Sequence, residues 1–158
     1  MREFWPEEKM DIFQMIKSDH KKVKDLFKKM KGKPKGGTRE SPEDIFPEID
    51  KELHGHMEGE EKLFYSTLEK EDDLRETILK NYEEHGIAKK MLEDMDKMSK
   101  GDEKWMAKLS VLRDVVERHM KDEEGDMFKK ARKVIKRDQA QELGKRFEEE
   151  KKSILQAV

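Results

Sequence analysis

Apolar residues recur at helical spacing along four successive stretches of this chain, and this pattern limits its fold more than any other feature. Residues three and four positions apart share one face of an α-helix, so each stretch has an apolar stripe that must pack against another. All four prolines lie before residue 48, and β-branched residues are sparse. The sequence therefore predicts an all-α protein, an antiparallel up-down-up-down four-helix bundle with a short C-terminal fifth helix.

The expected bounds of the first two helices follow from breaking and capping residues. We expect a first helix over about 6–31, with a proline at its first position, and a loop over the glycine-rich segment 32–37. Ser41 is followed by proline and two acidic residues, which is typical of a helix start, so a second helix is expected over about 42–70. Pro47 lies inside it and predicts a kink or a short separate turn.

The third and fourth helices are delimited in the same way. Asp72 and Asp73 suit the cap of a third helix over about 72–100. The pair Gly101–Asp102 then predicts a turn. The fourth helix is expected to run from there to about residue 137.

A further helix is expected at the C-terminus. Asp138 and Gln141 have the spacing of a capping box, so this helix is expected over about 138–156. With the bundle at about 6–137, the whole chain of 158 residues has the length of one domain.

Composition excludes several classes of protein. Lys+Arg 36 and Asp+Glu 38 give a formal net charge of -2, and the two signs are interspersed, so no basic face for a nucleic-acid partner is expected. No run of about 18 apolar residues exists, so no membrane partner is expected. The N-terminus lacks the apolar segment of a signal peptide, which favours a cytoplasmic location. Because the chain has no cysteine, any metal must bind nitrogen and oxygen atoms.

Four of the five histidines fall one per predicted helix, near its middle and on its apolar stripe. Two of them are followed four residues later by a glutamate, which lies on the same helix face one turn along. In an up-down-up-down bundle all these side chains meet at one level. The six residues are His20, His56, Glu60, His85, His119 and Glu123.

A metal centre explains these six residues better than a structural core does. A lone buried histidine usually finds hydrogen bonds, but unpaired buried carboxylates cost several kcal/mol, and a cation removes that cost. Zinc takes four ligands in a tetrahedron, while calcium and magnesium take oxygen alone. Four imidazoles and two carboxylates suit two first-row transition ions. Iron is the usual occupant of such bundle sites, with manganese or zinc less favoured.

A weak internal repeat relates the two halves of the chain. Asp19-His20 resembles Glu84-His85, and His56-Met57-x-x-Glu60-Glu61 resembles His119-Met120-x-x-Glu123-Glu124. Two helical hairpins related by a pseudo-two-fold axis would produce this pattern. A site with two ions lies naturally on such an axis.

The pattern His20…His56-x3-Glu60…His85…His119-x3-Glu123 resembles the hemerythrin-like (HHE cation-binding) family. The flanks Asp19-His20-Lys21-Lys22-Val23 and His56-Met57-Glu58-Gly59-Glu60-Glu61-Lys62-Leu63-Phe64-Tyr65 match as well, and the resemblance covers about residues 8–135. It implies a non-haem di-iron centre with an oxo or hydroxo bridge. In such a centre the two glutamates bridge the irons and the histidines are terminal ligands.

One departure from the family pattern lies on the third helix. Oxygen-carrying hemerythrins place two histidines a turn apart there, whereas the positions one turn from His85 hold Asn81 and Lys89. The missing ligand argues against transport-type reversible dioxygen binding and favours a more open site or a substitute ligand. Tyr82 is a candidate phenolate ligand, although a hydrogen-bonded core residue is the commoner role of such a tyrosine.

Three other polar residues lie beside the motifs. Glu61 and Glu124 follow the two glutamates directly, and they either hydrogen-bond a ligating ring or are solvated charges. His54 is expected at the surface, because two residues turn a helix by about 200°. In the metal-free protein, imidazole protonation below about pH 6.5 is expected to cause mutual repulsion and lower stability.

These features favour a binding module whose di-iron site takes dioxygen or another small diatomic molecule such as nitric oxide, for sensing, storage or delivery. The alternative is a redox enzyme that acts on peroxide or nitric oxide, or in repair of iron centres. A third interpretation is a structural module in which the metal only stabilises the bundle.

Overall fold

The structure, a computed structural model, describes residues 10–31 and 41–156, and within them it is helical apart from short connections, with no strand. This confirms the all-α class. The elements in chain order are α1 (Ile12–Lys31), α2 (Pro42–Gly59), η2 (Glu60–Tyr65), α3 (Ser66–Leu68), α4 (Asp72–Lys97), α5 (Glu103–Asp122), η3 (Glu123–Met127), α6 (Phe128–Val134) and α7 (Arg137–Gln156). The two η segments are π-helical and continue α2 and α5 without a break.

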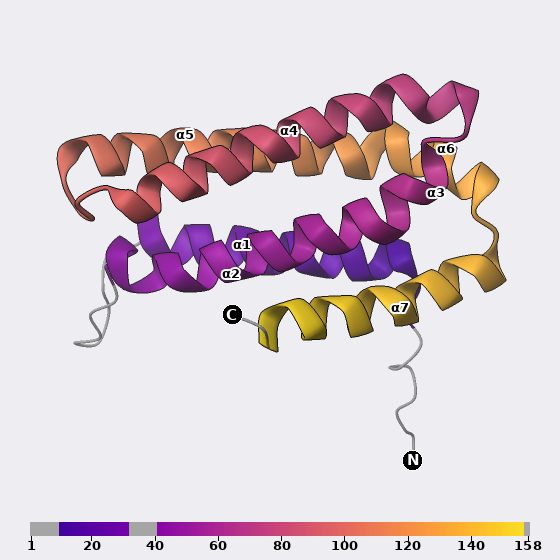
Figure 1. Ribbon diagram of the computed structural model, residues 1–158, viewed down its shortest axis with the longest axis horizontal. Helices are drawn as coiled ribbons and strands as arrows, with labels where there is room; N and C mark the ends of the chain where they lie inside the picture. Colours follow the sequence, from indigo (N-terminus) through magenta and orange to yellow (C-terminus); the bar gives the residue numbers. More distant parts are fainter. Residues whose placement is uncertain (1–9, 32–40, 157–158) are drawn as a thin grey trace, which may run out of the picture.

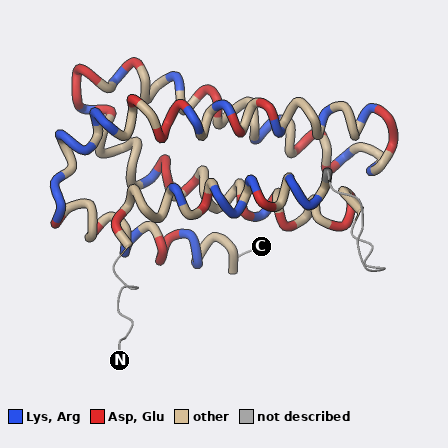
Figure 2. Tube along the Cα trace, turned by 180° about the vertical axis from the view of Figure 1, so that it is seen from behind, with Lys and Arg blue, Asp and Glu red and all other residues tan. Residues whose placement is uncertain are grey.

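The helices are arranged in two pairs with α7 added outside. Figure 1 shows α1 beside α2, α4 beside α5, and α7 lying along the α1–α2 pair. Lys and Arg are interspersed with Asp and Glu along all the helices, as Figure 2 shows. Within the described ranges no helix combines the length and the apolarity that a membrane crossing requires.

The apolar core is divided into two clusters, and a polar layer lies between them along α1, α2 with η2, α4, and α5 with η3. One cluster contains Phe46 and Trp105, whose ring centroids are 5.3 Å apart. The other contains Phe13, Phe64 and Phe128 in edge-to-face contact. On α1, for example, apolar residues before and after His20 belong to different clusters. The fold therefore places its buried polar residues at one level, with apolar packing on both sides.

The start of α1 differs from the expected bound. The Asp11 carboxylate accepts a hydrogen bond from the Gln14 backbone N–H at 2.9 Å, and the Gln14 side chain accepts one from the Asp11 N–H at 3.0 Å. This reciprocal cap begins the helix at Ile12. Pro6 and the segment 32–37 lie outside the described residues.

The start of α2 agrees with the expectation, but Pro47 does not interrupt it. Ser41 and Asp44 form a capping box, and Pro42 occupies the first turn. The helix runs through Pro47 to Gly59, so no separate turn forms. Because proline lacks an N–H, one backbone hydrogen bond is not made at this position.

Two other helices begin within one residue of the expected position, but their capping residues were misassigned, whereas the cap of α5 was correct. Glu71 takes the N-cap position of α4, so Asp72 and Asp73 lie in the first turn. The helix α7 begins at Arg137, so Asp138 is not its cap. The turn before α5 is as expected: Gly101 has a φ of 85°, and the Asp102 carboxylate accepts a hydrogen bond from the Trp105 N–H at 2.9 Å.

The C-terminal helix is not short, because α7 has 20 residues and packs against both α1 and α2. Close approach depends on two glycines. A Cβ at Gly144 would collide with the backbone of Met10 and Asp11, and a Cβ at Gly59 would lie 3.0 Å from the Phe147 ring. Since α7 meets its neighbours at backbone distance, it is an integral part of the structure.

Candidate metal centre

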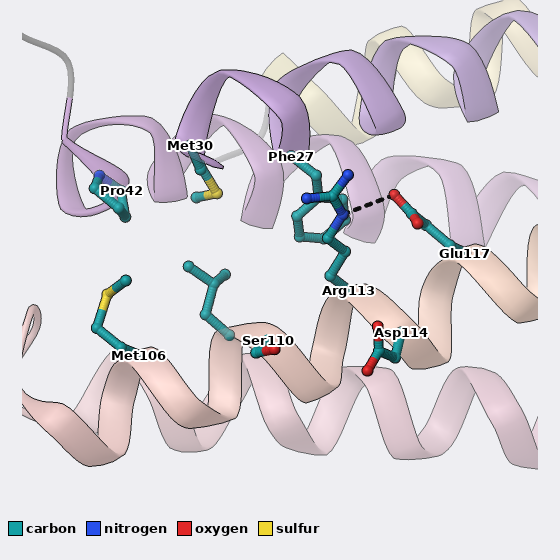
Figure 3. A pocket seen from close by; sticks show the side chains of 9 residues that line it. Phe27, Met30, Pro42, Met106, Ser110, Arg113, Asp114 and Glu117 are labelled. Atoms are coloured by element: carbon teal, nitrogen blue, oxygen red, sulfur yellow. Dashed lines mark hydrogen bonds and ion pairs between the residues drawn. The ribbon is translucent and has the colours of Figure 1, made fainter. Parts of the chain in front are cut away.

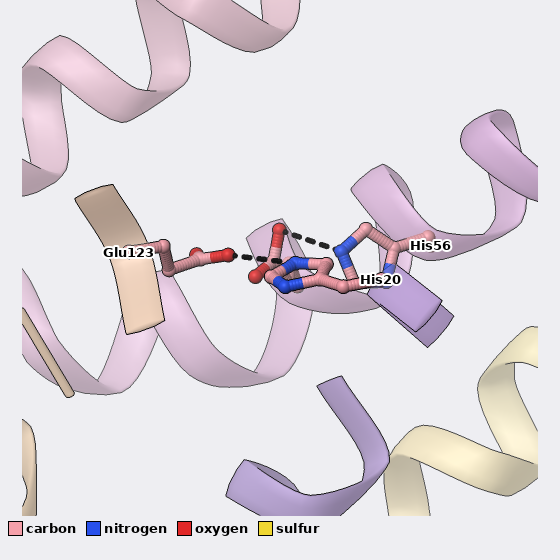
Figure 4. A group of neighbouring side chains, drawn as sticks. His20, His56 and Glu123 are labelled. Atoms are coloured by element: carbon pink, nitrogen blue, oxygen red, sulfur yellow. Dashed lines mark ion pairs between the residues drawn. The ribbon is translucent and has the colours of Figure 1, made fainter. Parts of the chain in front are cut away.

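All six predicted residues are buried and their side chains converge in the polar layer. They form two groups whose potential ligand atoms lie within 4.8 Å of one another: His20, His56, Glu60 and Glu123, and Glu60, His85 and His119. Figure 4 shows His20, His56 and Glu123 pointing toward one another. Glu60 belongs to both groups, so its carboxylate would be available to a cation held by either one.

Both glutamates begin a π-helical segment, a feature that the sequence analysis missed. Glu60 is the first residue of η2 and Glu123 the first of η3, at equivalent places in the internal repeat. A π-helix pairs residues five apart, and such segments are frequent at functional sites. Gly125, with φ −85° and ψ −113°, departs from helical geometry inside η3. The sequence signals nearest to these π-helical segments are Gly59, directly before Glu60, and Gly125, inside η3.

The π-helical turn brings Tyr65 into the centre. Its fully buried hydroxyl donates to Glu123 Oε2 at 2.7 Å and lies 3.2 Å from Glu60 Oε1. It is also 3.3 Å from Nε2 of both His85 and His119. Burial raises the pKa of Tyr65 well above 10.0, and the neighbouring charges of Glu123 and Glu60 add to this. The phenol is therefore a neutral hydrogen-bond donor in the absence of metal.

Tyr82, the candidate phenolate ligand, points elsewhere. Its hydroxyl donates to Glu69 Oε1 at 2.9 Å and to the Glu61 carbonyl at 3.4 Å. Burial and the hydrogen bond to Glu69 raise its pKa to about 12. The commoner role, a hydrogen-bonded tyrosine, is therefore the one that Tyr82 has. An α-helical register turns position 65 away from Glu60, so the sequence analysis missed Tyr65.

Each histidine of the centre has a carboxylate on its outer nitrogen, Nδ1. The pairs are His20 with Glu124 at 2.6 Å, His56 with Asp19 at 2.8 Å, His85 with Glu61 at 2.7 Å and His119 with Glu84 at 2.5 Å. When Nδ1–H donates to the carboxylate, the lone pair of Nε2 faces the centre. Glu61 and Glu124 thus hydrogen-bond the rings, whereas Asp19 and Glu84, each directly before a histidine, were missed.

These outer pairs follow the internal repeat. Asp19 of α1 reaches His56 of α2, and Glu84 of α4 reaches His119 of α5. Glu61 and Glu124, which follow the two glutamates, reach the histidines of α4 and α1. Both halves of the chain therefore use the same scheme.

Four buried atoms that face the centre have no hydrogen-bond partner among the described residues. They are His20 Nε2, His56 Nε2, Glu60 Oε2 and Glu123 Oε1. His20 Nε2 lies 3.1 Å from Glu123 Oε1, and His56 Nε2 lies 3.3 Å from Glu60 Oε1, which are ion-pair distances without hydrogen-bond geometry. Such atoms are costly to bury unless something else binds them. A nitrogen- and oxygen-ligated cation fits this donor set.

The titration properties of the two glutamates show the same need for a positive charge. Burial and the charge of Glu60 raise the pKa of Glu123. Burial also favours the protonated form of Glu60, but the charge of His56 and the hydrogen bonds with Glu123, His56 and His85 together outweigh it and hold the pKa of Glu60 well below 4.5. Burial lowers the pKa of His85, yet hydrogen bonds with Glu60 and Glu61 raise it to about 9. Without metal, protons on Glu123 and on the neighbouring histidines balance the negative charge of Glu60 and Glu123.

The positions where a further histidine would lie do not join the centre. The Asn81 side-chain N–H donates to Met127 Sδ at 2.8 Å, and Lys89 Nζ lies 3.2 Å from both oxygens of Glu61. His54 is partly exposed and pairs with Asp50 at 3.2 Å, so its surface position is confirmed.

Two cavities have different relations to the centre. A cavity of about 20 Å³ adjoins His85 and His119, and most of its other lining residues are apolar: Leu53, Met57, Ala88, Val115, Val116 and Met120. A larger pocket of about 370 Å³ lies among α1, α2 and α5, and none of the six predicted residues lines it (Figure 3). Arg113 there holds Glu117 at 2.9 Å.

Comparisons with known proteins agree with this geometry. The family model described as "Hemerythrin HHE cation binding domain" matches residues 11–131. A hemerythrin HHE cation binding domain-containing protein from Mycobacterium kansasii has a similar crystal structure. The TM-score is 0.78 at 22% sequence identity, over 94% of this chain and 89% of that one.

A curated relative is named DNA nickase, from Nostoc sp. (strain PCC 7120). It is 26% identical over 152 residues, which are 94% of this chain but 41% of the relative, so this chain spans about two fifths of that protein. The family match extends over most of the helices that carry the six buried residues. The chain belongs to the hemerythrin HHE cation-binding domain family.

Proposed function

We propose that this protein holds two iron ions and binds dioxygen or another small diatomic molecule such as nitric oxide, for sensing, storage or delivery. The proposed ligands are the six buried residues of the two groups, carried by an antiparallel up-down-up-down bundle. The observation that carries the proposal is the set of buried, unpartnered nitrogen and oxygen atoms that face one another. Mixed imidazole and carboxylate donors in two adjoining groups suit a pair of first-row transition ions.

The size of the inner cavity supports a small ligand. Its volume of about 20 Å³ is close to the space needed by one water-sized molecule. Its mostly apolar lining favours an uncharged diatomic over a polar organic substrate. Bound iron would supply the electrons and the open coordination position for such a ligand.

Tyr65 places a hydrogen-bond donor inside the centre. Its hydroxyl lies 3.3 Å from Nε2 of His85 and His119, two of the three histidines that line the cavity, so it is placed to donate a hydrogen bond to a small ligand bound near those two nitrogens. A nearby proton donor also favours the alternative function, a redox enzyme that acts on peroxide or nitric oxide or in repair of iron centres. In either case we infer that Tyr65, rather than Tyr82, compensates for the absent third-helix histidine.

We infer a cytoplasmic protein without a nucleic-acid or membrane partner. Along the described helices basic and acidic residues are interspersed, as Figure 2 shows, which argues against a basic face of the kind that binds phosphate backbones. The activity named for the Nostoc relative belongs to a protein more than twice as long, and it is not proposed for this chain.

Metal analysis combined with spectroscopy tests this function. Natively prepared protein is expected to contain two iron ions per chain, and the reduced form is expected to change its absorption on exposure to dioxygen or nitric oxide. Consumption of peroxide in repeated turnovers would favour the enzyme instead. One zinc ion and no iron, or a loaded form that reacts with none of these molecules, would overturn the proposal.

A pair of histidine variants provides the matched control. His56→Ala removes a proposed ligand and should lower metal content and thermal stability together, because an ion bound only to the folded state stabilises it. At 100 times the dissociation constant that stabilisation is about 2.7 kcal/mol. His54→Ala, on the same helix, should change neither. Equal metal loss in both variants would contradict the assigned ligands.

A further inference from the structure

A continuous chain of contacts joins α7 to one histidine of the centre. Lys151 Nζ lies 2.6 Å from Asp19 Oδ1 and 3.1 Å from Glu52 Oε1. The other oxygen of Asp19 accepts a hydrogen bond from His56 Nδ1 at 2.8 Å. The side chains of Lys151, Asp19 and Glu52 are 13%, 10% and 6% exposed. Charges buried this far are costly unless they are paired, so removal of one partner disturbs the others.

Asp19 differs from the other three outer carboxylates in its burial. Those three side chains are more exposed: Glu61 at 21%, Glu84 at 25% and Glu124 at 25%. Glu61 also has a lysine partner, Lys89 at 3.2 Å, but that lysine is on α4 beside His85 and brings no additional helix to the site. Among the described residues, Asp19, which accepts the hydrogen bond from His56, is therefore the one of these four carboxylates that α7 contacts through a lysine.

The internal repeat shows that this feature is not part of the shared scheme. Glu84 is the counterpart of Asp19, and Val115 is the counterpart of Glu52, because it lies four residues before His119 as Glu52 lies four before His56. An apolar residue at 115 cannot pair with a lysine. The contact with α7 thus makes the two halves of the centre unequal.

The packing of α7 on α2 determines where Lys151 lies. A Cβ at Gly55 would be 3.4 Å from Lys151 Cγ and 3.3 Å from Leu155 Cδ2, so the aliphatic part of the lysine crosses directly over this glycine. The Phe147 ring lies 6.0 Å from the His56 ring, between centroids. Lys151 reaches Asp19 only while α7 is docked in this position.

We propose that Lys151 is a positioning residue that holds Asp19 against His56, so that docking of α7 and metal binding at the His20–His56 group favour each other. The inference rests on the proposed metal centre. Groups that orient a ligating imidazole through its outer nitrogen typically change metal affinity by about 10–100-fold. Because linkage is reciprocal, metal binding at this group also stabilises the docked helix.

Cobalt(II) binding to two variants tests whether Lys151 affects the group with His56 and not the group with His85. His119→Ala retains the group with His56, whereas His56→Ala retains the group with His85. Adding Lys151→Met should weaken Co²⁺ binding by about 10-fold in the first background and leave it unchanged in the second. Hydrogen exchange gives a second readout. Co²⁺ should slow amide exchange in α7 of the unmodified protein and have little effect there once Lys151→Met is present.

Two further variants separate this role from helix packing. Lys62→Met removes an ion pair that joins α7 to η2, between Lys62 and Glu150 at 2.6 Å, and should change neither readout. Lys151→Arg keeps the charge and should restore most of the affinity. Equal weakening in both backgrounds, or the same effect from Lys62→Met, would overturn the inference.

Failure of a variant to fold and failure of the proposed metal centre can each be told apart from failure of the inference about Lys151. If Lys151→Met does not fold, Glu52→Gln/Lys151→Met removes one of the two buried carboxylates that lose their lysine partner, and it carries the same expectation. If the unmodified protein binds no Co²⁺, the proposed metal centre fails. If it binds Co²⁺ through His56 but Lys151 has no selective effect, only this inference fails.

Discussion

At the scale of single residues, the two halves of the internal repeat differ most at Tyr65. Its counterpart is Phe128, five residues after Glu123 as Tyr65 is five after Glu60. Phe128 packs against Phe13 at 5.1 Å between ring centroids and makes no polar contact of this kind. The hydroxyl of Tyr65 therefore adds one buried donor to one side of the centre, a second difference between its halves beside the contact with α7.

Removal of this hydroxyl should destabilise the metal-free protein. In Tyr65→Phe, Glu123 Oε2 loses the donor that lies 2.7 Å away and stays buried. Leaving a buried acceptor unpaired costs about 1–3 kcal/mol. The free energy of unfolding of the metal-free protein, measured in urea, should fall by that amount. Tyr82→Phe, whose hydroxyl bonds the partly exposed Glu69, should lose less, and equal losses would show that Glu123 does not depend on Tyr65.

At the scale of elements, the two π-helical segments determine which side chains face the centre. Each begins at a glutamate of the site and interrupts a helix that is α-helical before and after it. In η2 the wider turn aligns Tyr65 with Glu60 although the two are five residues apart. A π-helical segment of this kind behaves as one inserted residue in an α-helix.

Deletion of one residue should therefore be tolerated inside η2 but not in α2, which precedes it in the same continuous helix. Lys62 is exposed, and its deletion would bring Tyr65 to four residues from Glu60, the α-helical spacing for the same face. Deletion of the exposed Lys51 in α2 would instead rotate one part of the helix against the other by about 100°. Metal content and melting temperature should be largely retained in the first variant and lost in the second. Equal damage would mean that the π-helical turn is required for folding.

At the scale of the whole molecule, the buried charges give the metal-free protein an unusual dependence on pH. The pKa of His85 is raised from 6.5 to about 9, despite burial, by hydrogen bonds with Glu60 and Glu61. A group with a raised pKa in the folded state contributes stability that is complete below its unfolded pKa and lost as pH rises. The outer carboxylates act in the opposite direction: the hydrogen bond with His20 lowers the pKa of Glu124, and that with His119 lowers the pKa of Glu84.

The metal-free protein should therefore be most stable on the acidic side of neutrality. His85 contributes fully below about pH 6.5 and loses its contribution toward pH 9, whereas the carboxylates contribute above about pH 4.5 and lose theirs below it. This reverses the expectation from sequence, which placed the loss below about pH 6.5, because the carboxylates that face His20, His56 and His85 raise the pKa of these rings despite burial. Unfolding free energies of the metal-free protein at pH 5.5, 7 and 9 check this. A maximum above pH 8 would contradict it.

The site was predictable from sequence where it depends on helical periodicity within one element. His56 and Glu60 lie four apart on an apolar stripe, so their common orientation follows from the sequence, and the same holds for His119 and Glu123. Tyr65 was missed because an extra residue in the turn changes the register, and propensities do not reveal a π-helical segment. The cap at Asp11 was missed for a different reason, because the proline at position 6 suggested an earlier start of the first helix.

The amino-acid sequence by itself determined the helical class and the six buried residues that a metal would use, because both depend on spacing along one helix. The tertiary structure decided which carboxylate faces which ring, as when Asp19 crosses from α1 to His56 on α2. It also placed α7 against α1 and α2 through close approach at Gly59 and Gly144. From the sequence, α7 is predicted only to be an amphipathic helix. Contacts between helices depend on how their surfaces pack, and the periodicity of one helix contains no information about the face of another.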